Sequence, residues 1–82
     1  MKSTNIYTYP FVAICPENCQ AIVYKLMIES DRKILVEHIK MATALIKQGY
    51  HEDIANTLFD QFGGVQTIEA NHHGVDIKTV RS

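Results

Sequence analysis

The fold of this chain is decided by residues 31–64, which read DRKILVEHIKMATALIKQGYHEDIANTLFDQFGG and carry two consecutive helical patterns. In the first, apolar residues recur with the helical period from Arg32 to Gln48, behind Asp31, which is a good N-cap residue. Gly49 stops this helix, and a second amphipathic pattern begins near His51 and ends at the glycine pair that closes the stretch. Because so few residues separate the two patterns, the sequence predicts two antiparallel helices that lie side by side.

Strand-like segments flank this helical pair on both sides, and they are rich in aromatic and β-branched residues. A chain of 82 residues has room for one domain, which we take as residues 1–82. The order predicts an α+β two-layer sandwich of the form ββααββ, in which both helices cover one face of a four-stranded antiparallel sheet. The expected strands are Asn5–Cys15, Gln20–Ser30, Val65–Ala70 and Val75–Val80.

Pro10 indicates that the first strand lies at an edge of the sheet or carries a bulge, because proline has no N–H to donate to a neighbouring strand. The apolar residues on the inward faces of these elements make up the expected core. They are Val12, Ile22, Tyr24, Leu26, Ile28, Leu35, Ile39, Ala42, Ile46, Ile54, Leu58, Phe59, Phe62 and Ile68.

The turn of the first hairpin determines which apolar side chains face away from the helices. If the loop is Pro16-Glu17-Asn18, Cys15 lies opposite Cys19, and Val12 faces the helices. The open face of the sheet then collects Tyr7, Tyr9, Phe11, Val23 and Met27. A contiguous apolar patch usually marks an interface, so this set favours a homodimer or another homo-oligomer. A protein partner, a ligand surface and plain exposure remain as alternatives.

The second hairpin turns near Gly74, which fits the second central position of a two-residue turn. This register places Glu69 opposite Lys78, a favourable cross-strand pair. A turn at His72-His73 would instead oppose Glu69 to Asp76. The sequence therefore favours the register with the opposite charges paired.

Tracing the direction of the chain brings both hairpin tips to one end of the domain. Cys15 and Cys19 belong to one tip, and His72 and His73 belong to the other. Two thiolates and two imidazoles suit tetrahedral zinc, so these four residues are a candidate metal site. The competing interpretation is that the cysteines act as small apolar residues and the histidines as polar turn residues, in which case the protein has no cofactor.

The charge pattern argues against a nucleic-acid binder. The formal net charge is −1, and the basic residues of the first helix are interspersed with Asp31 and Glu37, which is typical of a solvated helix surface. No run of residues approaches the roughly 20 consecutive apolar residues of a membrane-spanning helix. The N-terminus shows no apolar signal segment. We therefore expect a cytoplasmic protein with reduced cysteines.

No acid, base and nucleophile converge in the sequence, and neither a phosphate-binding glycine loop nor a His-Glu-x-x-His motif is present. His38 is expected at the boundary of the core, half packed and half in solvent, and His51 is expected at the surface. The sequence thus argues against an independent enzyme and favours a small non-catalytic domain that self-associates or binds a partner through the apolar face. The alternative is a small-ligand or metal-binding protein.

Part of the second helical pattern resembles the second helix and third strand of tunnelling folds, the family of dihydroneopterin aldolase and the pterin synthases. The matching residues are Glu52-Asp53-Ile54-Ala55-Asn56-Thr57-Leu58, followed by Phe62 and Val65. The ββααββ order is also similar to that family. The resemblance implies oligomeric barrels with purine- or pterin-like substrates at subunit junctions, and it matches Glu52 to a glutamate that anchors the pterin. The chain has Asn71-His72-His73 where the family has Lys-Pro, and it lacks the histidines with which pterin synthases hold zinc.

Overall fold

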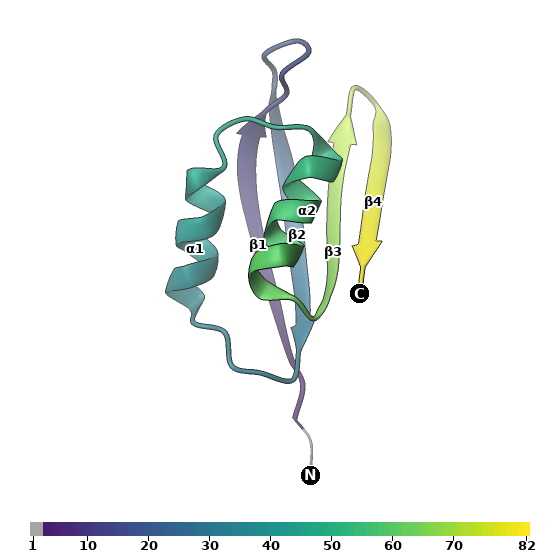
Figure 1. The fold of residues 1–82 in the computed structure, drawn as a ribbon. Coiled ribbons are helices and arrows are strands. Elements are labelled where there is room, and N and C mark those ends of the chain that lie inside the picture. Colours follow the sequence, from purple (N-terminus) through teal and green to yellow (C-terminus); the bar gives the residue numbers. More distant parts are fainter. Residues whose placement is uncertain (1–2) are drawn as a thin grey trace.

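The computed structural model describes residues 3–82 and confirms the predicted ββααββ sandwich. The four strands pair antiparallel in the order β1-β2-β3-β4. Both helices cover the same face of this sheet (Figure 1). The elements are β1 (Asn5–Ile14), β2 (Ala21–Ser30), α1 (Val36–Leu45), α2 (His51–Phe62), β3 (Val65–His72) and β4 (Val75–Arg81). No helix in this described part of the chain is long and apolar enough to cross a membrane.

Residues 15–20 connect β1 to β2, and a hydrogen bond between Cys15 and Gln20 leaves a loop of four residues, Pro16–Cys19. The predicted three-residue loop is therefore wrong. The backbone N–H of Cys15 donates to the carbonyl of Gln20 at 2.8 Å, so these two residues close the hairpin. Within the loop, the N–H of Cys19 donates to the carbonyl of Cys15 at 2.9 Å. The residue in the left-handed conformation is Cys19, with φ 60°, and not Asn18.

The longer loop shifts the register of β1 by one residue, which moves every β1 side chain to the other face of the sheet. Phe11 therefore lies in the core at 8% exposure, and Tyr7 and Tyr9 pack partly buried against it. Val23 and Met27 remain on the open face. The prediction that these five residues share one apolar face is wrong, because the register divides them.

The core lies between the sheet and the helices. It contains Phe11, Ala13, Ile22, Tyr24, Leu26, Ile28, Ile39, Ala42, Ile54, Ala55, Leu58, Phe62, Ile68 and Ala70. Four predicted core residues differ. Val12 is 53% exposed because of the register shift, and Leu35 is 45% exposed because it precedes α1. Ile46 and Phe59 are partly buried.

α1 is shorter at its start than the predicted helix from Arg32 to Gln48. Asp31 lies in a bend and does not cap the helix, because the N–H of Arg32 instead bonds the hydroxyl of Ser30 at 3.1 Å. The N-cap position is Leu35, whose side chain makes no capping hydrogen bond. Residues 31–35 therefore serve as the connection from β2 to the helical layer.

α1 also ends early, because the segment that links it to α2 pairs with the edge of β1. Ile46 is already extended, with ψ 94°. The N–H of Ile14 donates to the carbonyl of Lys47 at 2.9 Å, and the N–H of Gly49 donates to the carbonyl of Ile14 at 3.2 Å. This parallel bridge gives the backbone groups of Ile14, at the free edge of β1, their hydrogen-bond partners. β1 is an edge strand of the sheet, as Pro10 indicated.

α2 follows the prediction at both ends. It begins at His51, carries Glu52 and Asp53 in its first turn, and gives way to Gly63 (φ 64°) and Gly64 (φ 72°). A Cβ at Gly64 would lie 2.5 Å from the backbone carbonyl oxygen of Glu29 in β2, so a glycine is required there.

The second hairpin has the predicted register. Glu69 lies opposite Lys78, and the Lys78 ammonium is 3.8 Å from the Glu69 carboxylate. His73 (φ 55°) and Gly74 (φ 91°) form the two-residue turn.

Candidate functional site

Both hairpin tips lie at the same end of the sheet, together with the start of α2 (Figure 1). The Asn18 side-chain amide contacts the imidazole Nε2 of His73, which joins the two tips directly. A pocket of about 290 Å³ opens between them. It is lined by Cys15, Glu17, Asn18, Gly49, Tyr50, His51, His72, His73 and Ile77. The pocket therefore draws on three segments that are distant in sequence: the first hairpin tip, the start of α2 and the second hairpin.

A histidine pair forms one wall of this pocket. His51 Nδ1 lies 3.1 Å from His72 Nε2, a distance at which one of the two nitrogens donates a hydrogen bond to the other. His51 is 6% exposed, and its Nε2 atom is buried without a hydrogen-bond partner. Burial and, secondarily, the neighbouring His72 lower the pKa of His51 below its usual 6.5. His51 is consequently a neutral imidazole at neutral pH.

Tyr24 lies beneath the pair and is fully buried. Its ring is stacked on Phe11 with centroids 5.3 Å apart, and it contacts His51 and His72 at 5.5 and 5.7 Å. The hydroxyl has no partner among the described residues. Burial, and then the nearby Cys15, raise the pKa of Tyr24, which keeps the phenol protonated. The core thus presents an unsatisfied hydroxyl close to the pocket.

Tyr50 and Glu17 connect the helical layer to the first hairpin tip. The Tyr50 hydroxyl donates to the Glu17 carboxylate at 3.0 Å. This hydrogen bond is the main reason that the pKa of Tyr50 is raised. Since Tyr50 directly precedes α2, the contact holds the loop of the first hairpin against the start of that helix.

The structure distributes the proposed zinc ligands unevenly. Cys15, His72 and His73 line the pocket, whereas Cys19 is exposed and does not line it. Within residues 3–82, no group of three or more His, Cys, Asp or Glu side chains is arranged to hold a metal ion.

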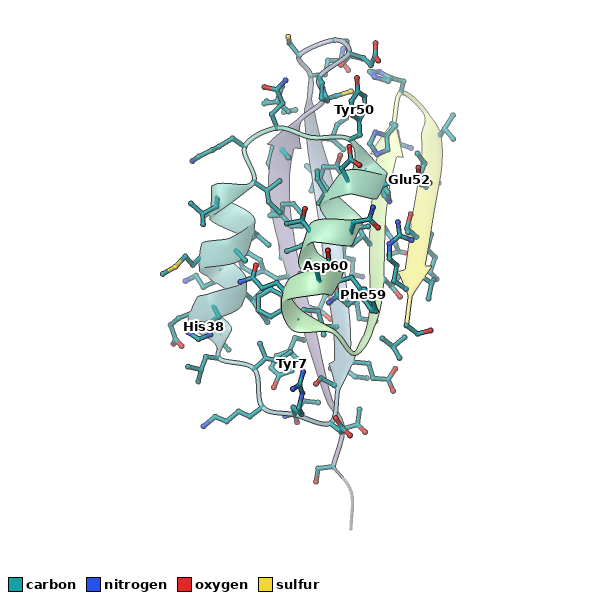
Figure 2. The ribbon with its side chains drawn as sticks, viewed as in Figure 1. Tyr7, His38, Tyr50, Glu52, Phe59 and Asp60 are labelled. Carbon is teal, nitrogen blue, oxygen red and sulfur yellow. The ribbon has the colours of Figure 1, made fainter. Side chains whose placement is uncertain are left out.

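Glu52 is exposed in the first turn of α2, directly after His51. Figure 2 shows Glu52 and Tyr50 at the hairpin-tip end of the domain, while Tyr7 and His38 lie at the other end. Glu52 therefore stands beside the pocket without lining it.

His51 was missed by the sequence analysis, which expected it at the surface. It is buried because it occupies the inward face of α2, three and four residues before Ile54 and Ala55. That spacing is the signal that would have found it. His38, which was expected to be half packed, is exposed on α1.

No protein-family model and no curated protein sequence matches this chain. Among solved structures, it is similar to the crystal structure of the archaeosine synthase QueF-Like in the apo form. The two share 14% sequence identity, the match covers 99% of this chain and 93% of that one, and the TM-score is 0.81. The chain therefore shares the overall fold of that structure.

Two findings overturn the expected non-catalytic domain that associates through an apolar sheet face. The register separates the residues of that face, and the fold over nearly the whole chain is one found in a synthase. The alternative was a small-ligand or metal-binding protein that uses the hairpin-tip residues, or a tunnelling-fold-like pterin or purine site that involves Glu52. It agrees better with the fold match.

Proposed function

We propose that this chain is a subunit of a homo-oligomeric tunnelling-fold enzyme that binds a purine- or pterin-like heterocycle at the hairpin-tip end. The observation that carries the proposal is the pocket that Cys15 lines together with the His51–His72 pair, beside Glu52. The fold shared with the archaeosine synthase supports it, as does the resemblance of α2 to the corresponding helix of tunnelling folds.

Glu52 supplies the recognition of the heterocycle in this proposal. An ionised carboxylate is an acceptor with two oxygens, and it can accept two parallel hydrogen bonds. The edge of guanine or pterin that carries a ring N–H and an exocyclic amino group offers two such donors. Exposure of Glu52 in the first turn of α2 leaves its carboxylate free to accept them.

Cys15 and the histidine pair supply the chemistry. A cysteine becomes a nucleophile as its thiolate, and a neutral imidazole in the same pocket is a suitable base for the thiol proton. His51 has a lowered pKa and contacts His72 at 3.1 Å, so a proton taken by one ring can pass to the other. This arrangement fits attack of the Cys15 sulfur on an electrophilic carbon of the bound heterocycle.

Association of several copies would complete the site. Among the described residues, β1 and β4 are the edge strands of the sheet, and only the upper end of β1 is covered, by the link before α2. Uncovered edges pair readily with another chain. In tunnelling folds the substrates lie at such subunit junctions. We keep the cytoplasm as the expected compartment, where Cys15 stays reduced.

A thermal-shift titration with guanine, xanthine and neopterin tests the proposal. A ligand present at 100 times its Kd adds about 2.7 kcal/mol to the free energy of unfolding. For a domain of this size, each kcal/mol raises Tm by about 4–8 °C. We expect a saturable rise with at least one compound, abolished by Glu52→Gln.

Asp53→Asn is the matched control, because Asp53 is an equally exposed carboxylate in the same turn of α2. This variant should bind like the unmodified chain. No shift with any of the three compounds, or equal losses in both variants, would contradict the proposed role of Glu52.

A further inference from the structure

We propose that Cys15 is a redox-modification site and that Cys19 is its resolving thiol, so that the two form a reversible disulfide across the first hairpin tip. Both cysteines are free thiols in the reduced protein. Cys15 lines the pocket, and Cys19 is exposed at the other end of the same short loop.

The backbone of the loop holds the two residues within disulfide range. The Cys19 N–H donates to the Cys15 carbonyl at 2.9 Å. The carbonyl carbon is bent, so the Cys15 Cα lies about 2.4 Å from its carbonyl oxygen. Adding the hydrogen bond and the N–Cα bond of Cys19 limits the Cα–Cα separation to less than about 6.8 Å. Disulfides usually span Cα–Cα separations of about 4.4–6.8 Å, so the backbone separation is compatible with a bridge.

The environment of Cys19 favours its role as the resolving thiol. It is exposed, so its sulfur is free to rotate in solvent. Its φ of 60° is unusual for a residue that is not glycine and marks a tight turn. The side chain of Asn18 accepts a hydrogen bond from the Gln20 N–H at 3.1 Å, which keeps the loop closed beside Cys19. Cys15, in contrast, is half-buried in the pocket.

The chemistry balances with hydrogen peroxide as the oxidant. The Cys15 thiolate attacks one peroxide oxygen, the O–O bond breaks, and a sulfenic acid and one water are produced. The Cys19 thiol then attacks the Cys15 sulfur, the S–O bond breaks, and a second water leaves as the S–S bond forms. Two thiols are oxidised by two electrons, and peroxide is reduced to two waters. A dithiol such as dithiothreitol reverses the step by thiol–disulfide exchange.

Formation of the bridge removes the Cys15 thiol from the pocket. The disulfide itself depends only on the two cysteines, whereas its effect on activity rests on the proposed function. Oxidation would switch the site off, and it would also protect Cys15 from irreversible oxidation to sulfinic acid.

Intact-mass analysis after treatment with a few molar equivalents of hydrogen peroxide tests the proposal on the full chain. We expect a species about 2 Da lighter than the reduced chain, with no thiol open to alkylation, which dithiothreitol reverses completely. The Cys19→Ser variant should instead gain about 32 Da at Cys15 or form a disulfide between two chains, because it has no resolving thiol.

The proposal is overturned if the unmodified chain gains the sulfinic mass while Cys19 remains open to alkylation. It is also overturned if Cys19→Ser and the unmodified chain oxidise alike. Circular dichroism of reduced Cys19→Ser shows that the variant is folded. A disulfide that forms without any heterocycle binding would refute only the proposed function, and binding without a disulfide would refute only this inference.

Discussion

The neighbouring residues Phe11 and Val12 provide the sharpest test of the register of the first hairpin. Phe11 is 8% exposed and stacks on Tyr24 at 5.3 Å, whereas Val12 is 53% exposed on the open face of the sheet. Truncating a buried phenylalanine to alanine costs about 3–5 kcal/mol, through lost burial and the cavity left behind. Truncating a half-exposed strand residue costs about 1 kcal/mol or less.

These costs are large against the stability of the whole domain. At about 0.05–0.15 kcal/mol per residue, a chain of 82 residues has a free energy of unfolding of about 4–12 kcal/mol. Phe11→Ala should therefore remove about a quarter or more of it. With an m-value of about 1–3 kcal/mol per molar, the urea midpoint should fall by at least about 1 M, and Val12→Ala should shift it far less.

Urea unfolding followed by far-UV circular dichroism measures both variants, at several chain concentrations so that dissociation is separated from unfolding. If Val12→Ala is the more damaging substitution, the four-residue loop and the assigned register are incorrect. The register expected from a three-residue loop, with Val12 in the core, would then hold.

Three further predictions concern individual groups. Tyr24→Phe should leave the free energy of unfolding unchanged or raise it, since it removes a buried hydroxyl without a partner. Tyr7→Phe should instead cost about 0.5–1.5 kcal/mol, because the Tyr7 hydroxyl accepts a hydrogen bond from the Ile34 backbone N–H at 3.0 Å. A loss of stability for Tyr24→Phe in urea unfolding would mean that its hydroxyl has a partner. The pKa of His51 is lowered in the folded state, so as pH falls His51 takes up a proton more readily in the unfolded chain. The free energy of unfolding should therefore decrease as pH falls below about 6.5, and His51→Gln should make Tm depend less on pH in this range. Gly64→Ala should lower Tm more than Gly74→Ala, because both glycines have positive φ but only at Gly64 would the new Cβ lie 2.5 Å from a backbone oxygen, that of Glu29. Equal losses of Tm in the two variants would argue against that close contact.

Much of the fold follows from local patterns in the sequence. α2 is predicted at both ends, because a 3.6-residue apolar period and a glycine pair act within the segment itself. The second hairpin is predicted in register, because a two-residue turn and one charge pair suffice to specify it. The placement of both hairpin tips at one end of the sheet follows from the order of the elements, whereas the contact between Asn18 and His73 also needs the observed strand order.

The remaining features depend on contacts between segments that the sequence does not show as neighbours. A fourth loop residue, held by the hydrogen bonds of Cys15, reverses the faces of β1 and moves Phe11 into the core. α1 ends early because Ile14 takes the backbone groups of the following residues as partners. His51 becomes part of a site only when α2 packs against the end of β3 and places it 3.1 Å from His72. Local propensity determined the elements of this protein, whereas hydrogen bonding and burial between distant segments decided its register and its candidate site.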